Sequence, residues 1–111
     1  MLPENRRPTP PGDVLVQEFL KPAKLTQLEL AARMGVPIQR LNTMINGKRA
    51  ITAETAWLLA RELGTTPQFW MNLQTAGDLW AARQRLETAG VIAAPRRRHL
   101  AARLARPRNA G

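Results

Sequence analysis

The sequence predicts an all-α protein of five helices, and two observations carry this prediction. The hydrophobic fraction of 44% is carried by Ala, Leu and Ile, while aromatic residues make up only 5%, and this mix favours helices. Helix-initiating residues and helix-ending glycines enclose runs of apolar residues spaced three or four apart, and no strand-like alternation competes with them. A length of 111 residues allows one small domain with extensions rather than two.

The first predicted helix begins at Pro10 or Pro11 and runs to Pro22. Proline is tolerated in a first helical turn, where the missing N–H costs little, and Asp13 suits the positive end of the helix dipole. Apolar residues then recur at helical spacing at Val14, Leu15, Phe19 and Leu20. Residues 1–10 contain three prolines and few apolar groups, so they are expected to form an extended N-terminal arm.

Two short helices follow, separated by Gly35. The earlier one begins with a capping-box pattern of Thr26 and Glu29, in which each side chain can accept a hydrogen bond from the other residue's backbone N–H. Its inner face carries Leu30, Ala31 and Met34. The later helix begins near Pro37 and ends at Asn46–Gly47. Its apolar side carries Leu41, Met44 and Ile45.

The fourth predicted helix begins at Thr52 and ends at Gly64, and the fifth begins at Thr66–Pro67 and runs to about Thr88. The fourth carries Ala56, Leu59, Ala60 and Leu63 along one face. Apolar positions of the fifth are Phe69, Trp70, Leu73, Leu79, Trp80 and Leu86.

The apolar residues of the fifth helix are too bulky and too numerous to face solvent together, and Trp57 of the fourth is expected in the core. One interpretation has Phe69 and Trp70 completing the domain core against the first and fourth helices. The other makes a symmetric dimer interface of Leu73, Leu79 and Trp80. Both can hold along different stretches of the helix.

The segment AARMGVPIQRLNTMINGKR, residues 31–49, predicts a helix-turn-helix unit. Two short helices joined by a tight turn cross closely, so the first needs a small residue at the crossing and the turn needs one that accepts a left-handed backbone. Ala31 and Gly35 meet these needs. When Gln27 is counted as its first residue, the small or apolar positions of the motif hold Leu30, Ala31, Gly35, Val36, Leu41 and Met44. An ordinary helical hairpin would explain only Ala31 and Gly35.

The formal net charge of +9 is concentrated in two places. Residues 96–111 contain six arginines and no acidic residue, and residues 26–49 contain four cations against the single acid Glu29. A basic face on an otherwise nearly neutral domain suits a polyanion such as a phosphate backbone. Arginines that merely keep the protein soluble remain the alternative.

If the unit binds DNA, the helix after Gly35 would lie in the major groove. The residues expected to contact bases are Ile38, Gln39, Arg40 and Thr43. Amide and guanidinium groups can read adenine and guanine, and apolar groups can meet the thymine methyl. The residues expected to contact phosphates are Gln27, Asn46, Lys48 and Arg49, which lie at helix ends or in the following loop. For each single residue a solvated surface role is the alternative.

Catalysis and metal binding are not expected. The chain has no cysteine, its single histidine is His99 in the basic tail, and no pair of carboxylates stands at catalytic spacing. No cofactor is expected, since the glycines stand alone as helix ends rather than in a phosphate-binding loop. No apolar run approaches a membrane span, and the absence of cysteine fits a cytoplasmic protein.

Three motifs extend the interpretation to a family. Pro11–Gly12 before LVQEFL, NGKRAIT at the end of the helix that follows Gly35, and LGTTPQFWMNLQ at the start of the last helix resemble the HigA antitoxins, a branch of the Cro/C1-type helix-turn-helix regulators of the XRE family. The resemblance covers residues 9–80. It implies a lambda repressor-like fold for the helix-turn-helix domain and its C-terminal helix at 11–90. Composition adds an N-terminal arm at 1–10 and, beyond the matched residues, an arginine-rich tail at 91–111 that has no counterpart in the family pattern.

The resemblance also implies function. Such a protein would be a homodimer that binds operator DNA, represses its own operon and neutralises a HigB-type toxin, a small mRNA-cleaving ribonuclease of the RelE-like fold. The family's DNA-reading positions fall on Gln27, Ile38, Gln39, Arg40 and Thr43. A free-standing XRE-family regulator without a toxin is the alternative. An RNA-binding accessory that acts through the arginine-rich tail is a third.

Overall fold

The computed structural model describes residues 6–93 of the chain, and these residues form helices and no strand. The helices are α1 (Pro11–Val14), η1 (Leu15–Leu20), α2 (Lys21–Ala23), α3 (Gln27–Met34), α4 (Ile38–Ile45), α5 (Ala53–Leu63) and α6 (Pro67–Thr88). Because α1, η1 and α2 follow one another without a break, they form a single helix, and the five predicted helices are confirmed. Most of the predicted basic tail, from residue 94 onward, lies outside the described residues, as do residues 1–5.

The first helix changes from α-helical to π-helical hydrogen bonding in its middle part, η1. In η1 the hydrogen bonds reach five residues back, as when the N–H of Lys21 donates to the carbonyl oxygen of Val16. Pro22 cannot donate, and its ring would collide with the carbonyl four residues earlier in a regular α-helix. The wider π-helical turn relieves this collision. The helix therefore continues past Pro22 to Ala23, slightly beyond its predicted end.

The predicted helix starts are confirmed in detail. The Thr26 N–H donates to Oε1 of Glu29 at 2.9 Å, and the Glu29 N–H donates to Oγ1 of Thr26 at 3.0 Å, which completes the capping box. Thr52 and Thr66 accept in the same way from backbone N–H groups three residues ahead. Side-chain oxygens thus satisfy donors that would otherwise be unpaired at three helix starts.

The core lies where the first helix, α3, α4, α5 and the start of α6 meet. Its buried members are Leu15, Leu20, Leu30, Ala31, Met34, Leu41, Met44, Ile51, Ala56, Leu59 and Trp70. Trp70 is fully buried, and its indole N–H donates to Oγ1 of Thr65 at 2.7 Å. The Trp70 ring also packs against Phe19, with 5.3 Å between centroids. Trp70 therefore completes the core as predicted, while Phe69 lies at its edge with 37% of its surface exposed.

The prediction that Trp57 belongs to the core is wrong, because 65% of its surface is exposed. The buried side of α5 is formed by Thr55, Ala56, Leu59 and Ala60. Since successive residues turn by about 100° around a helix, Trp57 faces away from that side.

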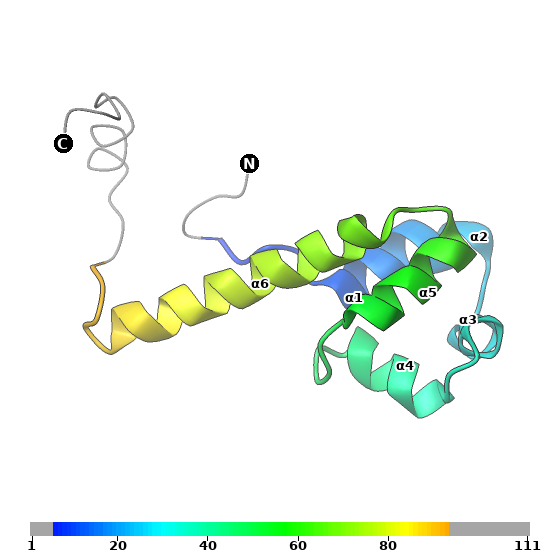
Figure 1. Ribbon diagram of the computed structural model, residues 1–111, viewed down its shortest axis with the longest axis horizontal. Coiled ribbons are helices and arrows are strands. Elements are labelled where there is room, and N and C mark those ends of the chain that lie inside the picture. The colour runs from blue at the N-terminus through cyan, green and yellow to red at the C-terminus, as the bar shows by residue number, and fades with distance from the viewer. Residues whose placement is uncertain (1–5, 94–111) are drawn as a thin grey trace, which may run out of the picture.

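The second half of α6 projects beyond the other helices (Figure 1). The first half is fixed by core packing and by Gln74, whose Oε1 accepts a hydrogen bond from the Ile51 N–H at 2.8 Å. The α4–α5 loop is thereby tied to α6. None of the helices within residues 6–93 has the length and apolar character needed to cross a membrane.

Candidate nucleic-acid interface

The position of α4 is set by a close contact with Gly12. Gly12 is buried, and a Cβ added to it would overlap the carbonyl oxygen of Ile45 and lie 2.8 Å from the Ile45 Cα. Only glycine allows the backbones of α1 and α4 to approach this closely. The Pro11–Gly12 pair therefore opens the first helix and also seats the C-terminal end of α4 against it.

The turn between α3 and α4 has the predicted geometry. Gly35 adopts a left-handed conformation with a φ of 75°, and the Val36 N–H donates to the carbonyl oxygen of Ala31 at 3.0 Å. Ala31, at the crossing, is 1% exposed. The C-terminal end of α3 is also held by Arg61 of α5, whose guanidinium donates to the carbonyl oxygen of Arg33 at 2.9 Å. These contacts confirm the helix-turn-helix unit.

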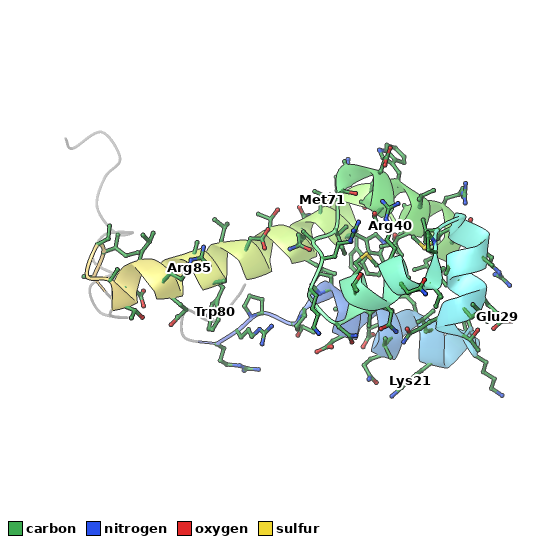
Figure 2. All side chains as sticks on the ribbon, turned by 90° about the horizontal axis from the view of Figure 1, so that it is seen from below. Lys21, Glu29, Arg40, Met71, Trp80 and Arg85 are labelled. Carbon is green, nitrogen blue, oxygen red and sulfur yellow. The ribbon has the colours of Figure 1, made fainter. Side chains whose placement is uncertain are left out.

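The predicted base-contacting residues differ in exposure. Gln39 is exposed, whereas Arg40 and Thr43 are half-buried. Figure 2 views the molecule from the side of α4, and Arg40 lies on that side. The Thr43 hydroxyl lies 3.0 Å from the carbonyl oxygens of both Gln39 and Arg40, so the helix occupies it as a donor and leaves the methyl group for apolar contact. Ile38 packs in part against the core, which leaves it less surface for a base than Gln39 has.

A chain of amide side chains links α3 to α4. The Asn42 Nδ2 group donates to Oε1 of Gln27 at 3.0 Å, and the Asn46 Nδ2 group donates to Oδ1 of Asn42 at 3.2 Å. This network fixes the orientation of Gln27 and Asn46 before any ligand arrives. Asn42 was not among the residues predicted from the sequence to contact DNA. The sequence carries no signal for its contact with Gln27, because the two residues are 15 positions apart and meet only in the folded motif.

Two exposed cations follow α4 in the α4–α5 loop. Gly47 turns the chain with a φ of 77°, and the Lys48 N–H then donates to the carbonyl oxygen of Thr43 at 2.9 Å. Lys48 and Arg49 are exposed. The ion pairs within residues 6–93 join Arg61 to Glu62 and Arg83 to Glu87, so neither loop cation is neutralised by a carboxylate there. The loop therefore offers two positive charges from a fixed backbone.

The one acid of the helix-turn-helix region is committed to a structural role. Hydrogen bonds from Thr26, backbone first, hold the pKa of Glu29 below its ordinary value, with a smaller contribution from the positive charge of Arg33 and burial opposing them. The carboxylate is thus kept ionised at the positive end of α3, where it stabilises the helix dipole.

The three residues predicted to form a dimer interface do not share one side of α6, since Leu73 and Trp80 lie on one side and Leu79 on another. Leu73 is partly buried against the core of its own chain, and Leu79 is 66% exposed. Trp80 is half-buried beside the N-terminal segment (Figure 2). Leu86, seven residues after Leu79, shares its face and is 41% exposed. The seven-residue spacing was visible in the sequence, although Leu86 was not assigned to the interface.

Comparison with known proteins adds a family and relatives. Residues 16–70 match a family described as helix-turn-helix. The Vibrio cholerae protein named antitoxin HigA-1 is 42% identical over 90 residues, which cover 81% of this chain and 85% of that protein. An Escherichia coli protein named uncharacterized HTH-type transcriptional regulator YbaQ is 42% identical over 83 residues, 75% of this chain and 74% of the relative.

Similar solved structures include complexes with DNA. The structure described as Pseudomonas aeruginosa antitoxin HigA with higBA promoter has a TM-score of 0.71 and 34% sequence identity. The similarity covers 75% of this chain and 90% of that one.

Proposed function

Because this chain belongs to the HigA antitoxin family of XRE-type helix-turn-helix regulators, we propose that it binds the operator of its own operon as a homodimer and represses transcription. The observation that carries the proposal is the outer face of α4, where Gln39 is exposed and the Gln27–Asn42–Asn46 chain holds neighbouring polar groups in place. The Pseudomonas relative, which was solved with promoter DNA, supports it. Operator binding places the activity in the cytoplasm.

In this proposal α4 enters the major groove. The Gln39 amide reads adenine, Arg40 donates to guanine or to a phosphate, and the Thr43 methyl meets a thymine methyl with partial help from Ile38. Phosphates are held by Gln27, Asn46, Lys48 and Arg49. The α3–α4 turn and the contact at Gly12 keep these groups in one fixed arrangement, so little order has to be gained on binding.

Neutralisation of a HigB-type toxin, a ribonuclease of the RelE-like fold, is the second part of the proposed function. It is supported by membership of the HigA family and by the antitoxin name of the Vibrio relative. A regulator without a toxin is the second candidate, favoured by the relative named as a transcriptional regulator. Co-expression with the product of the adjacent gene decides between them. A stable complex that relieves growth arrest supports the antitoxin role, and a neighbouring gene that is harmless when expressed alone supports the second candidate.

The DNA-binding proposal is tested by fluorescence anisotropy with the protein's own upstream DNA and a scrambled duplex of equal length. We expect wild type to prefer its own DNA, and Gln39→Ala with Thr43→Ala to lose about 2–5 kcal/mol of that preference. The matched control is Gln17→Ala, which alters an exposed glutamine on η1. Equal affinity of wild type for both duplexes would refute operator recognition, and an unchanged preference in the double variant would refute the residue assignment.

A further inference from the structure

The cavity between the N-terminal segment, the α4–α5 loop and α6 is larger than a simple packing gap. Its volume is about 390 Å³. Arg7 and Pro8 line it from the N-terminal side, Lys48 and Arg49 from the loop, and Asp78 and Trp80 from α6. The cavity therefore joins the chain before the first helix to the loop that carries the two exposed cations.

The N-terminal segment is held in place at this cavity. Pro8 is buried although it lies outside any helix, and it lines the cavity together with Trp80. The Trp80 Nε1 group is buried and has no hydrogen-bond partner among the described residues, so packing rather than a polar contact covers it. Pro8, Pro10 and Pro11 restrict the backbone, so the segment pays little entropy to stay where it is. Arg7 is thus presented from an ordered backbone.

The charges around the cavity are unbalanced. Arg7, Lys48 and Arg49 face one carboxylate, that of Asp78, which accepts a hydrogen bond from the Gln74 amide at 2.9 Å. Neither ion pair found within residues 6–93 involves any of these three cations. Three cations around one opening repel one another and attract an anion. Phosphate suits them, since arginine can donate to it through two N–H groups at once.

We propose that Arg7 of the N-terminal segment joins Lys48 and Arg49 at this cavity to bind a phosphate group. The cavity lies beside the α4–α5 loop, and the phosphate expected at that place is a backbone phosphate of operator DNA. This inference therefore rests on the proposed function. A free phosphate ion presents the same chemical group and is the alternative ligand of the cavity. Arg7 would then extend the DNA-contacting surface beyond the helix-turn-helix unit and add affinity without sequence preference.

The test compares Arg7→Ala with Arg6→Ala. Both arginines are exposed and both substitutions remove one charge, but Arg6 does not line the cavity. Affinities for operator and scrambled DNA are measured across a salt series. Because the proposed homodimer carries two copies of Arg7, we expect Arg7→Ala to reduce the slope of log affinity against log salt by about 2, so that its loss of affinity shrinks roughly tenfold between about 50 and 200 mM salt. The loss of affinity should be equal for operator and scrambled DNA, and Arg7→Lys should recover most of it. The affinity of Arg6→Ala should stay near that of wild type.

A second measurement titrates inorganic phosphate into the DNA-free protein and follows Trp80 by indole N–H NMR. A phosphate-dependent shift that Arg7→Ala abolishes, with an unchanged DNA salt slope, would assign the cavity to a free phosphate. Equal losses in the Arg6 and Arg7 variants, or no loss in either measurement, would overturn the proposal. If wild type fails to prefer its operator, the proposed function fails, while the phosphate titration still tests the cavity.

Discussion

Lys24 ends the first helix in a conformation that suits glycine better than lysine. Its φ of 54° and ψ of 39° place it in the left-handed region, and the Leu25 N–H closes the helix by donating to the carbonyl oxygen of Leu20 at 3.0 Å. A side chain in this region brings Cβ close to the carbonyl oxygen, at a cost of about 1–2 kcal/mol. The other helix ends of the helix-turn-helix region, such as Gly35, avoid this cost.

We therefore expect Lys24→Gly to raise the free energy of unfolding by roughly 0.5–1 kcal/mol, since relief of strain exceeds the added freedom of the unfolded chain. Urea denaturation followed by circular dichroism measures the change. Lys21→Gly is the control, because Lys21 has a right-handed φ of −63° and glycine there should destabilise by about 1 kcal/mol. The same sign for both substitutions would show that strain at Lys24 is not the cause.

At the scale of elements, the contact of α1 with the end of α4 makes a sharper prediction. Gly12→Ala should force these two backbones apart, lowering the free energy of unfolding by at least about 2 kcal/mol and weakening operator binding at least roughly tenfold in the folded protein. Gly77→Ala is the control, because a Cβ added there meets nothing within 4 Å. It should stabilise α6 by about 0.5–1 kcal/mol instead of lowering the free energy of unfolding. Thermal denaturation measures the change in stability, and fluorescence anisotropy below the unfolding transition measures the change in operator binding.

The elements also show what could be predicted from the sequence. Caps and helix ends depend on residues three or four apart, so Thr26, Glu29 and Gly35 were enough to locate them. The exposure of Trp57 depends on which side of α5 meets the other helices. The size and apolar character of tryptophan favoured burial, so the sequence led to the wrong prediction. The contact of Gly12 with Ile45 and the amide pair of Gln27 and Asn42 join residues far apart in sequence, so the fold had to be known first.

At the scale of the whole molecule, the projecting half of α6 needs an explanation. Leu79 and Leu86 share one of its faces and are 66% and 41% exposed. On another side of the helix, Leu73 packs against the core and Trp80 lies beside the N-terminal segment. An apolar face on a projecting helix fits a second copy of the same helix, and a two-fold dimer presents two α4 helices to a palindromic operator. We therefore locate the proposed dimer interface at Leu79 and Leu86, with Leu73 supporting it from within its own chain.

The combined substitution Leu79→Glu and Leu86→Glu should convert the proposed dimer into a folded monomer, because like charges would meet across the interface while the core is untouched. Light scattering after gel filtration measures the mass. The control is Leu28→Glu on α3, where the leucine is 65% exposed and lies on a different helix. The monomer would engage one half-site at a time, so operator affinity should fall at least roughly a hundredfold while affinity for a single half-site changes little. If the double variant keeps the mass of a dimer, the interface lies elsewhere. If the wild-type protein is a monomer and still represses, operator binding needs no dimer interface.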